Sequence, residues 1–189
     1  MRLNESASSN WLLRAVSCGG LIVLTLWGFS LLMASMMGPL RLVGVSQSCA
    51  ANLKNVTRGF QMYADDFDDV YPPGKQWTSA VSPYLDKPDR LHCPAVWKVG
   101  EVGYGYAMNS GLENKPRSKV ADARLTALVF DSADMGANAH DPVMSLPKPG
   151  RHRGRPQKQG PFRAGNNIGY MDGSVRMRFD GASSPAQPK

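Results

Sequence analysis

The sequence predicts an α+β fold, in which an N-terminal transmembrane helix continues into an amphipathic helix packed on a small antiparallel sheet. Three features support this prediction. Residues 15–37 contain no charged side chain, apolar residues recur at helical spacing from Cys49 to Phe67, and short apolar runs separated by turn residues follow. Because domains typically hold about 100–150 residues, we expect three parts: residues 1–38 with a tail and the transmembrane helix, an α+β domain over 39–180, and a disordered tail over 181–189.

The uncharged run over residues 15–37 is longer than the roughly 20 residues that a helix needs to cross a bilayer. A helix satisfies its own backbone hydrogen bonds, so we expect this run to contact membrane lipid. A cleaved secretory signal is the alternative, with Ala34 and Ser35 near the cleavage site. Basic residues flank both ends of the run, so charge alone does not orient it.

The cysteines favour a location outside the cytoplasm. Cys18 lies inside the apolar run, which leaves Cys49 and Cys93 as the pair in the rest of the chain. A pair without CxxC spacing suits a disulfide better than a zinc site, and disulfides persist outside the cytoplasm. Two separate buried thiols remain the alternative.

An amphipathic helix is predicted after Pro39. Its apolar face is formed by residues spaced three or four apart: Cys49, Leu53, Val56, Phe60, Tyr63 and Phe67. The pattern stops at Tyr71-Pro72-Pro73-Gly74, because two prolines do not continue a helix.

Short strands are predicted over residues 102–108 and 125–131. A hairpin is predicted near the C-terminus, where Asp172-Gly173 is a favoured two-residue turn with positive φ at both positions. We expect this hairpin to pair antiparallel with residues 125–131 and to bury Val175 and Phe130 beneath the helix.

Several short motifs occur in a recognisable order after the apolar helix. They are the Cys93-Pro94 step, the stretch Tyr104-Gly105-Tyr106-Ala107-Met108-Asn109, and a final hairpin with Asn167, Asp172, Gly173 and Val175. Over residues 39–179 the chain resembles the pseudopilin-like family, in particular proteins with a prepilin-type N-terminus and a C-terminal His-x9-Asp-Gly domain. The resemblance implies a long helix packed on a small antiparallel sheet, and a role linked to type II secretion or type IV pilus-like assemblies.

Two positions depart from the pattern of this family. The prepilin signal has its counterpart in Gly28-Phe29-Ser30-Leu31-Leu32-Met33, where Met33 replaces the family's Glu. The nearest histidine before Asp172 is His152, which lies twenty residues away where the family has ten. A basic segment separates the two, so the sequence does not favour a functional His–Asp pair.

The chain contains no HExxH, Walker A or GxSxG motif and no recognisable Ser-His-Asp arrangement, so we do not expect an enzyme or a cofactor. One cluster of carboxylates offers hard oxygen ligands for calcium: Asp65, Asp66, Asp68 and Asp69. No glycine or distal glutamate of an EF-hand loop is in register, so a solvated helix terminus is the favoured interpretation.

The charge of the chain is uneven. The formal net charge is +7, and residues 148–189 hold nine Lys or Arg against two Asp. We predict an anion-binding loop, for lipid headgroups or acidic glycan, formed by Arg151, Arg153, Arg155, Lys158 and Arg163. The absence of aromatic residues over 151–161 speaks against nucleic acid, and a solvated loop with no partner is the alternative.

Two functions follow from these features. The favoured one is a membrane-anchored, non-catalytic pseudopilin-like protein that serves as an assembly or scaffold component and has protein partners in that assembly. The alternative is a stand-alone anchored module that binds an anionic surface through the basic residues 151–163.

Overall fold

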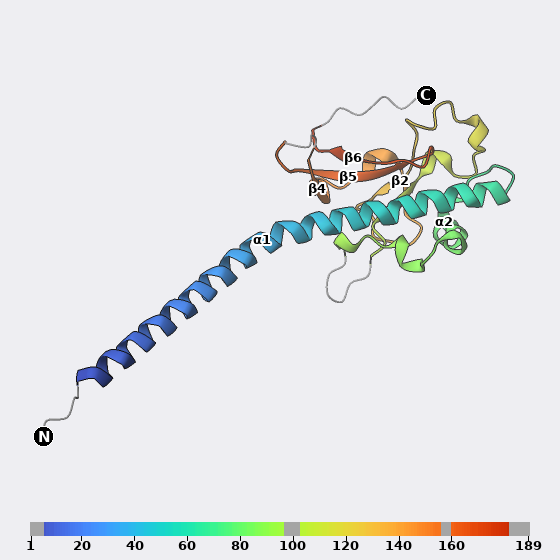
Figure 1. The fold of residues 1–189 in the computed structure, drawn as a ribbon. Coiled ribbons are helices and arrows are strands. Elements are labelled where there is room, and N and C mark those ends of the chain that lie inside the picture. Colours follow the sequence, from blue (N-terminus) through green and yellow to red (C-terminus); the bar gives the residue numbers. More distant parts are fainter. Residues whose placement is uncertain (1–5, 97–102, 156–159, 182–189) are drawn as a thin grey trace, which may run out of the picture. The chain divides into compact units, whose positions relative to one another are not determined.

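The computed structural model describes residues 6–96, 103–155 and 160–181. The chain divides into two compact units, Met1–Arg41 and Leu42–Lys189. The second unit combines helical segments with a mixed six-stranded sheet (Figure 1). Its helices and strands, apart from short 3-10 turns, are the last part of α1 (Ser6–Asp66), α2 (Trp77–Val81), β1 (Tyr106–Asn109), β2 (Ala127–Asp131), β3 (His140–Asp141), β4 (His152–Gly154), β5 (Arg163–Tyr170) and β6 (Val175–Phe179).

A single helix, α1, replaces the two successive helices that the sequence suggested. It runs through Gly38 and Pro39 without ending, although Pro39 has no N–H to donate to the preceding turn. In its C-terminal part the predicted apolar face is buried as far as Phe60, whereas Tyr63 is half-buried and Phe67, beyond the end of α1, is 51% exposed. The fully buried residues along it are Cys49, Leu53, Val56, Phe60 and Ala64.

The prediction of a transmembrane helix over residues 15–37 is wrong. Within the described ranges, the structure contains no helix that is long and apolar enough to cross a membrane. The contact with membrane lipid predicted for residues 15–37 stays a prediction.

The sheet is mixed, whereas an antiparallel sheet was predicted. Its strand order is β3-β1-β2-β5-β4, and β6 also pairs with β5. The β1–β3 pair is parallel, with Met108 opposite His140, and the remaining pairs are antiparallel. After β2 the chain crosses over to the other edge of β1 and forms β3 there. A parallel pair needs a crossover connection of this kind, which a hairpin cannot provide.

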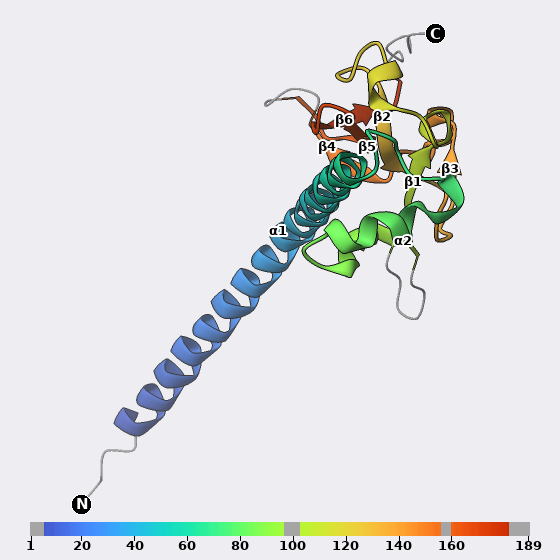
Figure 2. The ribbon, with the colours of Figure 1, turned by 90° about the vertical axis from the view of Figure 1, so that its right-hand side faces the viewer.

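The core lies on both faces of the sheet. Figure 2 shows the last part of α1 between the sheet and α2. Phe60 of α1 stacks on Trp77 of α2, with ring centroids 5.4 Å apart. On the opposite face of the sheet a smaller cluster contains Phe130 and Ile168. The central strand β2 is therefore covered on both faces, which explains why its residues 127–130 are all apolar.

The hairpin between β5 and β6 has a different turn from the one predicted. Tyr170 accepts a hydrogen bond from the N–H of Gly173 and donates its own N–H to Ser174. Gly173 has φ of 83°, and Asp172 is not among the residues with positive φ. This is the pattern of a three-residue loop, in which a turn is followed by one left-handed glycine. β5 pairs with β2 as expected and Phe130 is buried, whereas Val175 is half-buried.

We predict that Gly169→Ala destabilises the domain by about 1–3 kcal/mol, the usual range for overpacking a core. A Cβ at Gly169 would collide with the hydroxyl of Thr57 on α1. Thr57 is fully buried and its hydroxyl donates to the carbonyl of Leu53, so it has no room to move. The measurement is denaturant unfolding of the full chain.

Gly44→Ala is the matched control, because Gly44 is exposed on the same helix and a Cβ there would meet no atom within 4 Å. Alanine favours helix over glycine, so this variant should be as stable as the wild type or more so. Equal stability of the two variants would contradict the close contact between α1 and β5.

Candidate functional site

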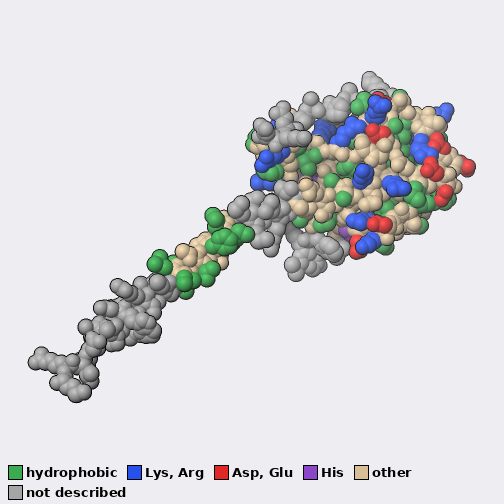
Figure 3. Space-filling model, in the orientation of Figure 1, with side chains coloured by type: hydrophobic (Ala, Val, Ile, Leu, Met, Phe, Trp, Pro, Cys, Tyr) green, Lys and Arg blue, Asp and Glu red, His purple; other side chains and the backbone are tan. Residues whose placement is uncertain are grey.

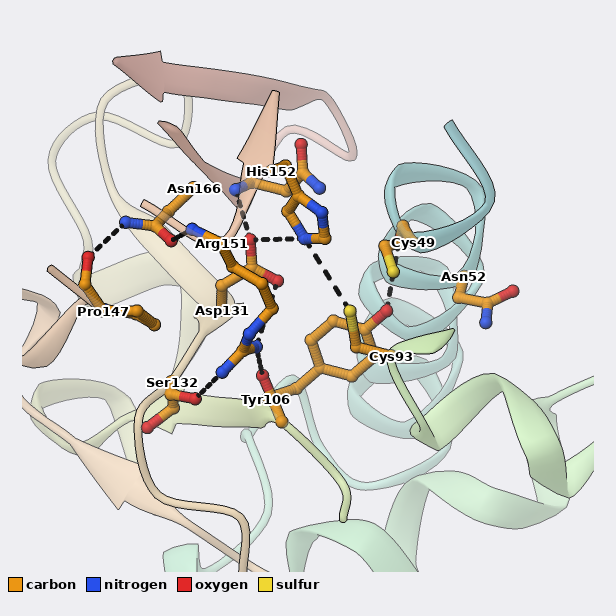
Figure 4. A network of polar contacts seen from close by, with 12 residues as sticks. Cys49, Asn52, Cys93, Tyr106, Asp131, Ser132, Pro147, Arg151, His152 and Asn166 are labelled. Carbon is orange, nitrogen blue, oxygen red and sulfur yellow. Dashed lines mark hydrogen bonds and ion pairs between the residues drawn. The ribbon is translucent and has the colours of Figure 1, made fainter. Parts of the chain in front are cut away.

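Two cysteines and a histidine from distant parts of the chain meet in the interior of the domain. Cys49 lies on α1, Cys93 lies between two 3-10 turns, and His152 is the first residue of β4. Their ligand atoms, the two sulfurs and an imidazole nitrogen, all lie within 4.8 Å of one another. Both cysteines are fully buried and His152 is 2% exposed. Figure 4 shows the three side chains facing one another.

A buried carboxylate adjoins this cluster. Asp131, the last residue of β2, has a fully buried side chain whose Oδ2 lies 3.1 Å from His152 Nε2. The same oxygen accepts a hydrogen bond from the backbone N–H of Asn167 at 2.5 Å. The other oxygen, Oδ1, is buried and has no hydrogen-bond partner within the described protein. A buried carboxylate is stable only when it is paired, so the surrounding residues have to supply partners for Asp131.

Arg151 supplies the opposite charge. Its side chain is 8% exposed, and its Nη1 lies 3.7 Å from Asp131 Oδ1. The guanidinium donates to the carbonyl of Gly105 at 2.6 Å and to the carbonyl of Ser132. The backbone of Arg151 is held as well, because its N–H donates to the side chain of Asn166. Arg151 is therefore fixed against the end of β2 by its main chain and its guanidinium.

Further hydrogen bonds hold the cysteines in place. The hydroxyl of Tyr106 donates to the backbone carbonyl of Cys49 at 3.1 Å. The side-chain amide of Asn52, one turn further along α1, donates to the carbonyl of His92 at 3.0 Å. Cys93 donates its own N–H to the carbonyl of Tyr104. These bonds tie α1 to the segment that carries Cys93.

The proximity of these groups changes their proton affinities. A hydrogen bond from Cys49 lowers the pKa of Cys93 to about 5; burial opposes this shift and His152 assists it. The hydrogen bond with Cys93, together with burial, raises the pKa of Cys49 far above its usual range. Burial alone would lower the pKa of His152, but hydrogen bonds to Asp131 and Cys93 raise it to about 9. The favoured protonation state is therefore a Cys93 thiolate beside a His152 imidazolium.

This arrangement differs from the Cys-His-Asp geometry of a nucleophilic enzyme. In such a triad the two imidazole nitrogens serve the nucleophile and the carboxylate separately. Here Nε2 of His152 faces both Cys93 Sγ, at 3.7 Å, and Asp131 Oδ2. Cys93 is also fully buried, so a substrate would have no access to its sulfur. The chemistry that the site offers is the binding of a small cation or, with an external two-electron oxidant, the oxidation of the two thiols to a disulfide.

The predicted partners Cys49 and Cys93 are in contact, and both are free thiols in the structure. Their positions, on α1 and after the 3-10 turn Pro88–Leu91, match the segments that the predicted disulfide was meant to join. The bond itself stays a prediction.

The predicted anion-binding residues are not one surface. Arg151 was assigned to this set wrongly, because its guanidinium is buried against Asp131. Arg155 lies over the ring of Phe162 at 4.3 Å, and Arg163 donates to the carbonyl of Asp180. Arg153 is exposed, and Lys158 lies outside the described residues.

Three of the four aspartates proposed for calcium have other partners. Asp65 and Asp69 form ion pairs with Arg117 at 2.6 and 2.5 Å. Asp66 accepts a hydrogen bond from Tyr84. Asp68 and Asp69 have positive φ where the chain leaves α1. These contacts hold the C-terminal end of α1 against the 3-10 turn Arg117–Lys119.

The family-motif residues support the buried site and the turns near it. Gly105 has φ of 74°. A Cβ at this position would lie 3.1 Å from Arg151 Nη1, so a side chain would crowd the guanidinium. Each of the others holds a local contact: Tyr104 against His92, Tyr106 on the Cys49 carbonyl, Asn109 on Gly111 and Ala127, Asn167 on Asp131, Asp172 on Ser174 and Arg176, and Gly173 in the hairpin loop.

Asp131 and His152 were not predicted as site residues. His152 was set aside because a basic insertion separates it from Asp172, but its partner is Asp131 on a different strand. The sequence contains one signal for this pair. Asp131 directly follows the apolar residues 127–130, and a charge at the end of a buried strand destabilises the fold unless it is paired.

No protein-family model matches this chain, and neither a curated protein nor a solved structure does. The likeness to pseudopilin-like proteins therefore rests on the motifs and their order alone.

We predict that Arg151→Met destabilises the protein by about 3–5 kcal/mol, because it removes the buried guanidinium that faces Asp131 Oδ1, an oxygen with no hydrogen-bond partner among the described residues. Arg153→Met is the matched control two residues away, and since Arg153 is exposed it should change the free energy of unfolding by at most about 0.5 kcal/mol. Chemical denaturation of both variants makes the comparison. If the two substitutions had equal effects, the role of Arg151 as a buried partner would be refuted.

The thiolate–imidazolium pair predicts a pH dependence of stability in the reduced, metal-free protein. The raised pKa of His152 gives stability that is complete below about pH 6.5 and is lost as the pH rises through about 9. The lowered pKa of Cys93 gives stability that is complete above about pH 9 and is lost as the pH falls through about 5. Between about pH 6.5 and 9 the two contributions change in opposite directions and offset each other. Below about pH 6.5 the His152 contribution is constant, and only the Cys93 contribution still changes.

We therefore expect the stability advantage of the wild type over Cys93→Ser to shrink as the pH falls from 6.5 to 5. Urea unfolding with a reductant present measures it. A constant advantage across this range would show that Cys93 stays a neutral thiol.

Proposed function

We propose that this protein is a non-catalytic assembly or scaffold component of a pseudopilin-like system, in which the first part of α1 packs against helices of neighbouring subunits. The observation that carries the proposal is the exposed apolar surface of that segment, drawn in green along the helix in Figure 3. Its large apolar side chains are between 45% and 67% exposed. They are Leu21, Ile22, Val23, Leu24, Leu26, Trp27, Phe29, Leu31, Leu32 and Met33.

This apolar surface surrounds the helix. Successive helical residues point about 100° apart, so the consecutive residues from Leu21 to Leu24 cover the whole circumference. An apolar surface of this kind marks a binding region, and its all-round distribution suits several neighbouring helices better than a single groove. The same helix ends in a folded domain, which supports the resemblance to pilin-like subunits.

The way in which the helices associate follows from the residue at position 33. In the prepilin pattern a glutamate at this place pairs with the amino terminus of a neighbouring subunit. Met33 carries no charge and is 45% exposed, so apolar packing has to provide the contact. Such packing is non-directional, which allows a partner with a different pilin-like sequence as well as another copy of this chain.

Site-specific photo-crosslinking tests the proposal in cells that produce the full chain. A photoreactive residue at Trp27 should give either a ladder of chain-to-chain adducts or one discrete adduct with a second protein that has an apolar N-terminal helix. Phe67, which lies just beyond the end of α1 and is 51% exposed, is the control position and should give neither product.

A second variant tests whether the adduct depends on apolar packing. Leu24→Glu should remove the Trp27 adduct, because a buried carboxylate without a partner opposes association. Met62→Glu, at an exposed position on the same helix, should leave it in place. Identical products from Trp27 and Phe67, or no protein adduct at Trp27, would contradict the proposal.

A further inference from the structure

Beyond this assembly role, we propose that Cys49, Cys93 and His152 form a zinc-class metal site with three protein ligands, beside the buried carboxylate of Asp131. Among the residues that the structure describes, these three are the group of potential ligands that lie close enough to share one ion. Two thiolates and an imidazole are ligands that Zn²⁺ prefers. The site is independent of the apolar surface on the first part of α1, so either proposal can fail alone.

The spacing of the ligand atoms agrees with a tetrahedral ion. With Zn–S bonds of about 2.3 Å and Zn–N bonds of about 2.0–2.1 Å, a sulfur and a nitrogen on one tetrahedral ion lie about 3.5 Å apart. Cys93 Sγ and His152 Nε2 are 3.7 Å apart. Two sulfurs on such an ion would be separated by about 3.8 Å, and the two cysteine sulfurs lie within 4.8 Å.

Asp131 lies beside this site and is not one of the three grouped ligands. Its Oδ2 is 3.1 Å from His152 Nε2, and its negative charge next to the site favours a bound cation. The fourth position on the ion is left for a small exogenous ligand such as water. A disulfide would use only the two sulfurs, whereas a metal ion also uses the histidine.

Charge and proton balance also fit. Zn²⁺ with two thiolates is neutral, and the adjoining carboxylate of Asp131 is balanced by the buried guanidinium of Arg151. Cys93 is already a thiolate, so Cys49 and Nε2 of His152 each give one proton to the solvent on coordination. Asp131 Oδ2 keeps the backbone N–H of Asn167 as a hydrogen-bond donor. No oxidant or reductant is needed.

The three ligands join three segments of the chain. They come from α1, the loop before the 3-10 turn Pro94–Val96, and β4 (Figure 4). A metal ion at this point would fasten the helix to the sheet, and the burial of all three ligands keeps a substrate away from the fourth position. The ion would therefore stabilise the fold and leave the non-catalytic role unchanged.

The test uses the full chain with Cys18→Ser, so that thiol counts refer to Cys49 and Cys93 alone. The reduced protein is titrated with Zn²⁺ and, in parallel, with Co²⁺ as a spectroscopic probe. We expect one ion per chain, an intense near-ultraviolet band from thiolate-to-cobalt charge transfer, visible bands typical of tetrahedral cobalt, and a thermal midpoint that rises with metal concentration.

His152→Ala should weaken zinc binding by at least about 100-fold, because loss of even a supporting residue costs 10–100-fold. His140→Ala is the control, since His140 lies on β3 and outside the ligand group. If His152→Ala fails to fold, Cys49→Ser takes its place, and loss of the charge-transfer intensity is the readout.

Three results would overturn the proposal. The reduced wild-type protein gives no stoichiometric binding and no charge-transfer band, His152→Ala binds zinc as tightly as His140→Ala, or the native chain contains a Cys49–Cys93 disulfide and binds no zinc after reduction. Crosslinking through Trp27 would be unaffected by any of these results.

Discussion

The fold depends on the pairing of one buried carboxylate. Asp131 ends the central strand with no exposure to solvent, where an isolated charge would be too expensive to maintain. Its partners come from different segments: Arg151 before β4, His152 in β4 and the backbone of Asn167 in β5. The residues that satisfy this carboxylate therefore also fix the position of β4 and β5 beside β2. Through Cys93 and Cys49 the same cluster reaches α1, so the helix and the sheet share one polar centre.

Much of the local structure could be predicted from the sequence. The spacing from Cys49 to Phe60 indicates the buried helical face, and the apolar run that ends at Asp131 indicates a covered strand. In contrast, the wrong turn at Asp172 reflects a choice between two hairpin loops that both favour Asp-Gly. The transmembrane helix was inferred from the uncharged run over residues 15–37, and among the described residues no helix is long and apolar enough to cross a membrane.

The candidate site could not be predicted from local sequence patterns. His152 and Asp131 are separated by twenty residues that include β3, and the antiparallel pairing of β4 and β2 with β5 brings them together. The basic character of residues 151–163 suggested a surface, yet the first arginine of that segment is in the interior. Its position depends on where the carbonyls of Gly105 and Ser132 point, which is a property of the assembled sheet.

A double-mutant cycle on Asp131 and Arg151 tests the central claim most directly, with Asp131→Asn, Arg151→Met and the double variant compared in denaturant unfolding. Because the two side chains belong to one buried network, we expect a coupling free energy of at least about 1.5 kcal/mol, within the range for residues in contact. Each single variant should leave an unpaired buried group, and the double variant should recover part of the loss. Additive effects, within about 0.5 kcal/mol, would contradict the claim that this ion pair anchors the sheet.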